Sequence, residues 1–355
     1  MEPDPKKILI VQLRRVGDVL FTLPAARAVK ARFPRARVDF LTESPSDQLV
    51  RLDPHVDRTW TYEKDRPLFW LRKIRGERYD WVLDFHANGR TLLLTLLSGA
   101  RIRAGFDGPL PRRIAFNRRT RSTDRKYLVE QKLDVLRDLG IPAGDWRWGL
   151  DIPDDKKRWA AELLAGLGVS ASEKIAGIAP ATRRPVRAWK NDRFGAVVRR
   201  LIEAGHPVLL LWGPGEKPWM EEILESAGLP APLRGRALLP PETTLIQLAA
   251  LIEKCSAVLA VDNGPKNLAV ALDVPTATLS GPTNPLSFNP RNDPRHVLLR
   301  DDSLPCIACG SNSCPTRHEC MENISADRAG EAVLSLLRTA RTSPAPRTPK
   351  EKVSP

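Results

Sequence analysis

Apolar residues occur in short runs that alternate with stretches of helical periodicity. The run KILIVQL at 7–13 has the length of a buried strand. Apolar residues then recur at helical spacing, at Val16, Leu20, Leu23, Ala26 and Val29. Two more strand-like runs follow at 37–42 and 81–85. Strands that alternate with helices are typical of βαβ units, so the first part of the chain is predicted to form a parallel sheet.

The same alternation begins again later in the chain. Residues 128–140 are predicted to form an amphipathic helix ended by Gly140, and 141–155 an irregular linker. The second array is predicted to have strands and turns at 174–180, 207–216, 257–265 and 275–283, and helices at 192–204, 244–255 and 266–272. We therefore expect an α/β protein with two doubly wound domains, 1–150 and 151–340, that face each other across a cleft. The proline-rich, charged tail at 341–355 is predicted to be disordered.

Length and charge narrow the classes of function. A chain of 355 residues is long enough for two domains with separate cores. No apolar run approaches the roughly 18 residues of a membrane span, and the N-terminus lacks the pattern of a secretion signal, so we expect a cytoplasmic protein. The net charge of +14 indicates a polyanionic partner. Aromatic residues make up only 6% and are not interleaved with basic ones, which argues against single-stranded nucleic acid.

Basic residues are densest at 101–126. Two interpretations are open: the segment is a solvated loop, or it lies on an acidic membrane leaflet or on acceptor phosphates.

Polar turns follow three predicted strands of the second array: APATRRP, WGPGE and VDNGPKN. Ligands bind at the carboxyl ends of strands in open parallel sheets, so these turns are expected to share one site. The turn GPGE has neither Walker nor G-x-G-x-x-G spacing, which leaves a nicotinamide-dependent oxidoreductase with little support.

Several motifs resemble the ADP-heptose:lipopolysaccharide heptosyltransferases, glycosyltransferase family nine. They are LRRVGDVLFTLPAARAVKARFP, WVLDFHANGR, ATRRPVRAWKNDRF, LLLWGPGE and VDNGPKNLAVALDVPTATLSGPTNP, in the family's order and spacing over about residues 7–325. The resemblance implies a GT-B fold of two Rossmann-like domains, with the acceptor bound mainly by the N-terminal half and a nucleotide-sugar donor by the C-terminal half. It also implies an inverting reaction without a metal ion in the chemical step.

Asp18 has two interpretations. A carboxylate in the first turn of a helix is stabilised by the helix dipole by up to about 1 kcal/mol, which needs no catalytic role. The resemblance instead places the family's general base at Asp18. A sugar hydroxyl is too weak an acid for a carboxylate to deprotonate in advance, so the proton must leave as the hydroxyl oxygen attacks an oxocarbenium-like carbon. We favour the catalytic interpretation.

Four residues are candidates for acceptor binding: Arg14, Arg15, His86 and Arg90. Arginines at the end of a strand could simply be solvent-exposed residues, or they could bind a carboxylate or phosphate through bidentate hydrogen bonds. Arg14 matches the family's arginine. His86, next to Asp84, is equally consistent with a core histidine whose hydrogen bonds are satisfied.

The loop ATRRPVRAWK supplies the candidates Thr182, Arg183, Arg187 and Lys190. It could be a basic loop anchored by a core tryptophan, or a clamp whose cations stabilise the charge that develops on a departing diphosphate. Many family members have lysine where this chain has Arg187. In this chain, therefore, a planar guanidinium group replaces the compact ammonium group of lysine.

Further donor-site candidates come from the later turns. Glu216 is predicted to contact the ribose or base, and Thr283 to line the same pocket. A helix that starts near Gly264 and Pro265 could bind an anion at its N-terminus, and Asp262 could either brace this turn or bind donor hydroxyls. Family members commonly have Thr or Gly at the position of Asn263 and His at the position of Asn267. Asn267 keeps a hydrogen-bond donor, but unlike histidine it cannot carry a positive charge.

Four of the five cysteines, Cys306, Cys309, Cys314 and Cys320, are clustered. Two interpretations are open: thiolates that bind zinc, or the structural loop that the family resemblance implies. Because their spacing is irregular, we assign them no metal; Cys255 is predicted to be buried.

The sequence thus predicts an inverting glycosyltransferase that moves a heptose, or a similar sugar, from a nucleoside diphosphate to a lipopolysaccharide-core acceptor. ADP-heptose is the implied co-substrate and no cofactor is required. A lipid-linked anionic saccharide is the implied acceptor, with contact to the inner membrane leaflet and no nucleic acid partner. A sugar-nucleotide epimerase of the same fold and a non-catalytic nucleotide-sugar-binding protein remain alternatives.

Overall fold

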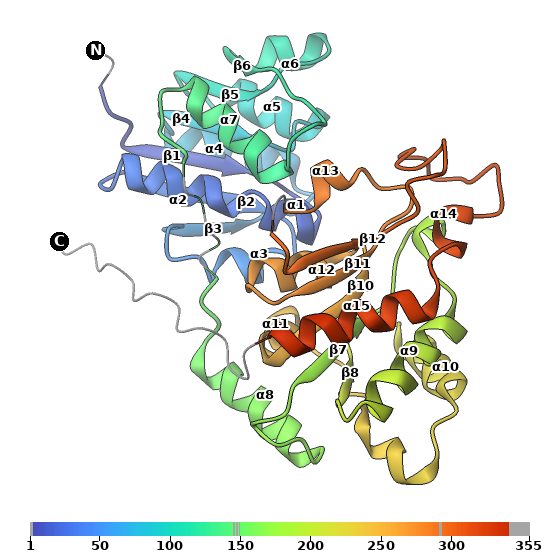
Figure 1. Cartoon of the computed structure of the whole chain (residues 1–355). Coiled ribbons are helices and arrows are strands. Elements are labelled where there is room, and N and C mark those ends of the chain that lie inside the picture. The colour runs from blue at the N-terminus through green and yellow to red at the C-terminus, as the bar shows by residue number, and fades with distance from the viewer. Residues whose placement is uncertain (1–2, 145, 147, 149, 291–292, 341–355) are drawn as a thin grey trace. The chain divides into compact units, whose positions relative to one another are not determined.

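A computed structural model describes residues 3–144, 146, 148, 150–290 and 293–340. The chain divides into two compact units (Figure 1). The first comprises the described residues of Met1–Asp151 and Leu286–Arg291, and the second those of Ile152–Pro285 and Asn292–Pro355. The chain therefore returns to the first unit for a short segment that the sequence did not indicate. The predicted disorder at 341–355, and part of the predicted linker, lie outside the described residues.

The first unit is built on a six-stranded parallel sheet of order β3-β2-β1-β4-β5-β6. Its strands are β1 (Lys7–Val11), β2 (Arg37–Thr42), β3 (Arg58–Thr61), β4 (Trp81–Asp84), β5 (Ile102–Phe106) and β6 (Arg118–Thr120). Its helices are α1 (Val16–Leu20), α2 (Leu23–Arg32), α3 (Asp47–Val50), α4 (Pro67–Glu77), α5 (Gly89–Leu97), α6 (Leu110–Ala115) and α7 (Leu128–Asp138). Helices α2 and α7 pack together on one side of the sheet, and α4 and α5 lie on the other (Figure 1).

The second unit repeats this plan with a six-stranded parallel sheet of order β12-β11-β10-β7-β8-β9. Its strands are β7 (Ile175–Ala179), β8 (Val208–Leu210), β9 (Ala237–Leu238), β10 (Cys255–Val261), β11 (Thr276–Leu279) and β12 (His296–Leu299). Its helices are α8 (Asp154–Gly166), α9 (Asn191–Glu203), α10 (Lys217–Ala227), α11 (Leu245–Lys254), α12 (Gly264–Ala271), α14 (Glu319–Glu322) and α15 (Ala326–Thr339). Helices α9, α10 and α15 form one layer, and α8, α11 and α12 form another.

Burial explains the central strands. Every residue of Ile8–Val11 is at most 1% exposed, as expected for a strand covered on both faces of a parallel sheet. The segment of helical periodicity from Val16 to Val29 forms two helices, α1 and α2, with a break at Phe21 and Thr22. Pro24 has no N–H to donate to the carbonyl four residues earlier, so the helical hydrogen-bond pattern cannot continue through this point.

Both sheets have the same winding, and the fold class predicted from the sequence is confirmed: each unit is a doubly wound α/β domain. The strand order reverses between β1 and β4 in the first sheet and between β7 and β10 in the second. Doubly wound proteins bind ligands at the carboxyl ends of the strands beside such a reversal. Asp18 and His86 follow the first pair of strands, and Thr182 and Asn263 follow the second.

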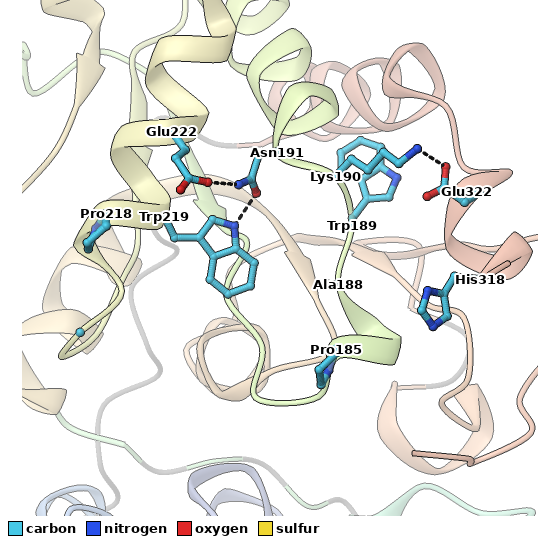
Figure 2. Close-up of a pocket in the computed structure, with 11 residues that line it drawn as sticks. Pro185, Ala188, Trp189, Lys190, Asn191, Pro218, Trp219, Glu222, His318 and Glu322 are labelled. Atoms are coloured by element: carbon cyan, nitrogen blue, oxygen red, sulfur yellow. Dashed lines mark hydrogen bonds and ion pairs between the residues drawn. The ribbon is translucent and has the colours of Figure 1, made fainter. Parts of the chain in front are cut away.

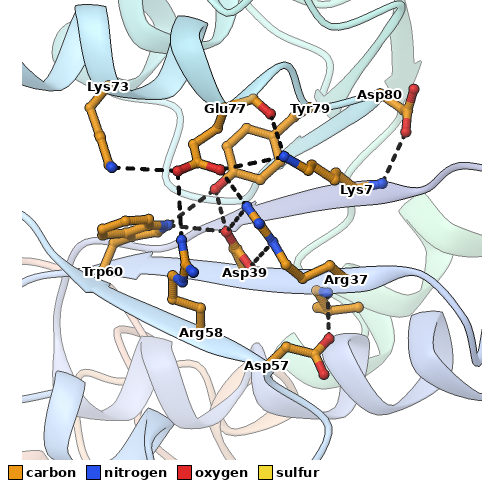
Figure 3. A network of polar contacts seen from close by, with 11 residues as sticks. Lys7, Arg37, Asp39, Asp57, Arg58, Trp60, Lys73, Glu77, Tyr79 and Asp80 are labelled. Atoms are coloured by element: carbon orange, nitrogen blue, oxygen red, sulfur yellow. Dashed lines mark hydrogen bonds and ion pairs between the residues drawn. The ribbon is translucent and has the colours of Figure 1, made fainter.

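A buried polar network reinforces the first unit (Figure 3). The fully buried Asp39 of β2 accepts hydrogen bonds from the Arg37 guanidinium (2.9 and 3.0 Å), the Tyr79 hydroxyl (2.5 Å) and the Trp60 indole (3.2 Å). Burial, followed by the Asp39 carboxylate, raises the pKa of Tyr79 above its usual range. The network joins β2 and β3 to the chain that leaves α4, so it stabilises the sheet and has no place in the candidate site.

The returning segment contains the short helix α13 (Pro285–Phe288). The Ser287 hydroxyl donates to the Asp124 carbonyl at 2.9 Å, and the Phe288 ring lies 6.3 Å from the Phe21 ring. None of the helices among the described residues has the length and apolar content needed to cross a bilayer.

Candidate active site

Asp18 is the third residue of α1, directly beyond the carboxyl end of β1. Its Oδ2 accepts a hydrogen bond from the Arg15 amide at 3.2 Å, a contact that caps the N-terminus of α1. The side chain is half-buried rather than enclosed. Asp18 therefore caps its helix and also remains accessible to a ligand, so the two interpretations of this carboxylate do not exclude each other.

The strand order brings the predicted acceptor-side residues together. Val11 of β1 is paired with Asp84 of β4, so the turns that follow these strands are neighbours. The charges of Asp18, Arg14 and Arg90 all act on His86. Four predicted positions thus share one neighbourhood at the carboxyl edge of the first sheet.

The structure adds a buried cation, Lys132 of α7. Its ammonium group donates to Gln12 Oε1 at 2.9 Å and lies 5.2 Å from the centre of the Phe85 ring. Burial lowers the pKa of Lys132 to about 8, and the carboxylates of Asp18 and Asp84 oppose this shift. Lys132 thus places a buried cation in electrostatic contact with the candidate base Asp18.

Gln12 forms hydrogen bonds with both Lys132 and His86. An ammonium group has only donors and a carbonyl only accepts, so the Gln12 Oε1 must face Lys132 while its Nε2 donates to the Arg14 carbonyl at 2.8 Å. The second proton of Nε2 then points to His86 Nδ1 at 3.1 Å. His86 Nδ1 must therefore accept, which assigns the neutral tautomer with a proton on Nε2.

Electrostatics supports the neutral form of His86. Burial is the main cause that lowers the pKa of His86 to about 4, and the cationic neighbours Arg14, Lys132 and Arg90 act in the same direction. His86 therefore offers its Nε2–H as a hydrogen-bond donor in this site. The satisfied-histidine interpretation holds for Nδ1.

Asp84 has a structural role in this arrangement. Its Oδ1 accepts the backbone N–H groups of His86 (3.0 Å) and Ala87 (2.9 Å), and its Oδ2 accepts the Thr95 hydroxyl (3.2 Å). Complete burial raises the pKa of Asp84 to about 6 despite these hydrogen bonds. The carboxylate fixes the turn that carries His86.

The arginines at this edge differ in their contacts. The Arg14 side chain is largely exposed, and its Nε lies 3.8 Å from Glu43 Oε2. Arg15 is exposed and contributes its backbone amide to the Asp18 cap. Arg90 is half-buried and interacts with the Tyr62 hydroxyl. Exposed guanidinium groups suit an anionic ligand in this neighbourhood.

In the second unit, Asp262 lies between two cations at the end of β10. Its Oδ2 is 3.0 Å from Arg187 Nη1, and its Oδ1 is 3.1 Å from the ammonium group of Lys266. Lys266 is completely buried, and burial lowers its pKa. Both oxygens of Asp262 therefore hold ion pairs, which is the bracing role that the sequence left open for this residue.

The N-terminus of α12 is less open to anions than its sequence suggested. Asn263 donates through Nδ2 to the carbonyls of Ala179 (2.9 Å) and Ala181 (3.0 Å), and its Oδ1 accepts the Lys266 amide (2.9 Å). Pro265 has no N–H. Two of the first three residues of α12, which starts at Gly264, therefore offer no free amide, because Pro265 lacks an N–H and the Lys266 amide is bonded to Asn263 Oδ1.

Two buried polar atoms belong to predicted donor-site residues of the second unit. Among the described residues, Asn267 Oδ1 and Thr283 Oγ1 are buried and have no hydrogen-bond partner. Burying a polar group without a partner costs about 1–3 kcal/mol. A polar ligand that bonds to these two predicted positions would remove that cost.

A pocket of about 620 Å³ opens beside the loop that carries Lys190 (Figure 2). It is lined by Pro185, Ala188, Trp189, Lys190, Asn191, Gly215, Pro218, Trp219, Glu222, His318 and Glu322. Lys190 forms an ion pair with Glu322 at 3.0 Å, and Asn191 joins Glu222 (2.8 Å) to the Trp219 indole. Arg187 and Asp262 do not line this pocket, so the predicted donor residues are divided between the pocket and the buried ion pairs.

Two other predicted donor-binding residues form hydrogen bonds with the backbone of the turns in which they lie. The Thr182 hydroxyl accepts the Arg184 amide at 3.2 Å, and Glu216 Oε2 accepts the Gly213 amide at 2.8 Å just before α10. Arg183 is exposed. The roles of Thr182 and Glu216 in donor binding stay predictions.

Comparison with known proteins agrees with this architecture. The model of the family described as glycosyltransferase family 9 (heptosyltransferase) matches residues 69–318. The chain belongs to glycosyltransferase family 9. The resemblance stated from the sequence motifs is confirmed.

Relatives from three bacteria illustrate the family 9 similarity. Lipopolysaccharide heptosyltransferase 1 of Pseudomonas aeruginosa is 28% identical over 330 residues, which covers 87% of each chain. The family 9 glycosyltransferase of Veillonella parvula has a TM-score of 0.81 at 21% identity and covers 95% of this chain and 99% of its own. An E. coli heptosyltransferase solved with ADP-2-deoxy-2-fluoro heptose has a TM-score of 0.69 at 19% identity and covers 93% and 99%. The solved structures establish a GT-B fold.

The family 9 motifs did not reveal Gln12, Lys132 or Lys266. A signal for Lys132 was present, because it lies on the apolar face of its helix with Val129, Leu133 and Leu136. Lys266 follows Asp262 by four residues, the spacing that lets side chains meet on a helix. Gln12 lies inside the first predicted strand run, and its role depends on partners distant in sequence.

The cysteines of this family 9 chain have free thiols. Cys255 is buried as predicted, and burial raises the pKa of its thiol to about 12. Within the described ranges, no group of three or more His, Cys, Asp or Glu side chains is placed to hold a metal ion.

Replacing Lys132 by Met should change how stability depends on pH. Between pH 8 and about 10.4, an unfolded chain keeps the Lys132 proton that the folded chain has released, so rising pH favours the folded wild type. The wild type should gain roughly 3 kcal/mol over this interval relative to Lys132→Met. Urea unfolding of the first unit between pH 7 and 11 measures this difference. The exposed-site variant Lys64→Met should follow the wild type; parallel curves for Lys132→Met and wild type would contradict the assignment.

Proposed function

We propose that this family 9 glycosyltransferase transfers a heptose with inversion from ADP-heptose to an acceptor of the lipopolysaccharide inner core. Family membership and the curated lipopolysaccharide heptosyltransferases among its relatives support the sugar and the acceptor class. The donor is supported by the solved E. coli enzyme whose ligand is a fluorinated ADP-heptose. One observation carries the catalytic part: Asp18 stands beside the buried Lys132 and a histidine held in its neutral form.

In the proposed reaction, a hydroxyl of the acceptor attacks the anomeric carbon of the donor while Asp18 takes its proton. The new C–O bond forms as the bond to the diphosphate oxygen breaks, and ADP leaves with the electron pair. Attack opposite to the leaving group inverts the anomeric carbon, and one base is enough for this single displacement. His86 donates from Nε2 to an acceptor oxygen and so orients the attacking group.

Cations in the second unit would stabilise the departing ADP. The diphosphate gains negative charge as the bond breaks, and fixed positive groups lower the energy of that state. Lys190 and Arg183 are exposed cations of this loop, Lys190 paired with Glu322, while Arg187 is shared with Asp262. Asn267 and Thr283 offer hydrogen bonds that the described residues leave unused. The proposed chemical step needs no metal ion.

The acceptor in this proposal is a lipid-linked, anionic saccharide. Arg14, Arg15 and Arg90 supply positive charge around Asp18 and would bind its acidic groups. Such an acceptor is presented by a membrane, so we place the enzyme in the cytoplasm at the inner face of the cytoplasmic membrane. The basic segment 101–126 is consistent with contact to the acidic leaflet.

Thermal melting with a nucleotide panel tests the donor assignment. A ligand at 100 times its Kd stabilises the folded state by about 2.7 kcal/mol, which raises Tm by about 5–10 °C for units of this size. ADP and ADP-heptose should give this shift, and UDP or UDP-N-acetylglucosamine a smaller one. Thr283→Val should weaken the shift with ADP-heptose, whereas the exposed-site variant Ser311→Ala should not. An equal response to all nucleotides, or none to ADP-heptose, would reject the proposed donor.

A further inference from the structure

We propose that the outer surface of α4, α5 and α6 docks the enzyme on an anionic lipid bilayer. This surface, called here the α4–α6 surface, consists of Leu68, Phe69, Leu93, Leu96, Leu97, Leu110 and Ile114. The choice of a bilayer rests on the proposed lipid-linked acceptor, and the location of the contact follows from the exposure and charge of these helices.

Exposed apolar residues are concentrated on these three helices. Among the described residues, nine large hydrophobic side chains are exposed, and seven of them belong to the α4–α6 surface. Leu68 and Leu110 are 67% and 69% exposed. A concentration of exposed apolar side chains on neighbouring helices is typical of an interaction site.

Helix α5 shows the pattern most clearly. Its sequence GRTLLLTLL buries Leu92 and Leu94 against the unit and leaves Leu93 and Leu97 47% and 43% exposed. Leu93, Leu96 and Leu97 have the i, i+3, i+4 spacing of one helical face. A surface helix ordinarily has polar residues on this face, so α5 is suited to a second apolar environment.

The three helices are neighbours in the fold. Helix α5 packs against α4 on one side and α6 on the other, and α4 and α5 lie behind the first sheet (Figure 1). Leu110 and Ile114 are four residues apart on α6, and Leu68 and Phe69 begin α4. The exposed side chains therefore come from adjacent helices rather than from scattered sites.

Positive charge surrounds the α4–α6 surface. Residues 64–126 contain 16 Lys and Arg and 6 Asp and Glu, which is +10 of the chain's net +14. Arg72 on α4 and Arg118 on β6 are exposed, and the Arg66 guanidinium lies 4.4 Å from the centre of the Phe69 ring. Asp107 pairs with Arg113 (3.6 Å) and Arg119 (3.8 Å) and neutralises only part of this charge.

This charge selects the partner. Two copies of the chain that met through the α4–α6 surface would bring like charges together, whereas an acidic bilayer attracts each nearby Lys or Arg by about 1 kcal/mol. Apolar side chains surrounded by cations are the pattern of a domain that lies on the membrane interface. The basic segment 101–126 belongs to this surface through α6 and β6.

Vesicle flotation with the full chain tests the proposal. Vesicles of phosphatidylcholine with 30% phosphatidylglycerol, free of any saccharide acceptor, should bind the wild type, and pure phosphatidylcholine vesicles should bind it at least tenfold less tightly. Raising the salt concentration should weaken binding to the acidic vesicles. Leu93→Ser with Leu97→Ser should reduce binding tenfold or more, and Arg72→Gln or Arg118→Gln about fivefold each. Leu167→Ser, at an exposed leucine outside this surface, is the matched control and should bind normally.

Several outcomes would overturn the proposal. One is equal binding by wild type and the Leu93/Leu97 double variant; another is a concentration-dependent dimer in sedimentation that the double variant loses, which would assign the surface to a second copy. The variants must keep the wild-type Tm and the ADP-heptose shift. Vesicle binding without heptose transfer would refute the proposed function alone, whereas normal transfer to a water-soluble acceptor without vesicle binding would refute the docking surface alone.

Discussion

Asp18→Asn should lower acceptor-dependent turnover by about 10²- to 10⁴-fold, the usual contribution of a positioned general base. The amide cannot take the hydroxyl proton as the acceptor attacks, but its oxygen can still accept the Arg15 amide that caps α1. The fold and the donor affinity should therefore persist. Release of ADP with and without acceptor, together with the thermal shift in ADP-heptose, separates the two effects.

The control is Asp154→Asn, which changes an exposed carboxylate in the first turn of α8. This variant should retain wild-type turnover, because its charge only stabilises a helix N-terminus. If Asp18→Asn kept more than a tenth of the wild-type rate, Asp18 would be a helix cap and the proposed mechanism would fail. Acceptor-independent change of the donor that depends on Asp18 would instead favour an epimerase.

Asp262→Asn should destabilise the second unit by about 3–5 kcal/mol, as expected when one partner of a buried ion pair is removed. The substitution removes the carboxylate that Arg187 and the completely buried Lys266 share. Unfolding by urea, followed through the transition of the second unit, measures the loss. Two like charges also face one another after the change, so Tm should fall strongly.

A double variant makes this prediction specific. Adding Lys266→Met to Asp262→Asn also removes the buried cation that paired with Asp262 and should restore much of the lost stability, giving a favourable coupling energy in the double-mutant cycle. Asp273→Asn is the matched control, because Asp273 forms an exposed ion pair with Arg295 and should change stability by less than about 1 kcal/mol. Equal losses at Asp262 and Asp273 would show that burial of the ion pair is unimportant.

The sequence predicted the central strands of both sheets because their signal is local. Continuous apolar runs such as Ile8–Val11 and Val258–Val261 can be buried on both faces only in a covered parallel sheet. The placement of Asp18 and Asn263 beyond such strands follows from the same logic. The break between α1 and α2 could also have been read from Pro24, although the apolar spacing alone suggested one helix.

Side-chain networks were harder to predict because they join distant segments. Gln12 and Lys132 are separated by 120 positions, and their hydrogen bond exists only after α7 has packed on the sheet. Asn263 is a second example. Its position at the start of a helix indicated an anion site, but its side-chain amide donates instead to the carbonyls of Ala179 and Ala181. Local patterns gave the positions of these residues, and tertiary contacts determined their partners.

Residues 286–290 belong to the first unit although they lie within the sequence of the second, and this limits how the chain can be divided into separate fragments. A fragment that starts at Ile152 would contain α13 but not its contacts with Phe21 and Asp124. Its Phe288 ring would then be exposed to water, which would lower the solubility of the fragment without any change in ligand binding. Binding studies on a separated C-terminal half should therefore replace Phe288 by a polar residue or use the intact polypeptide.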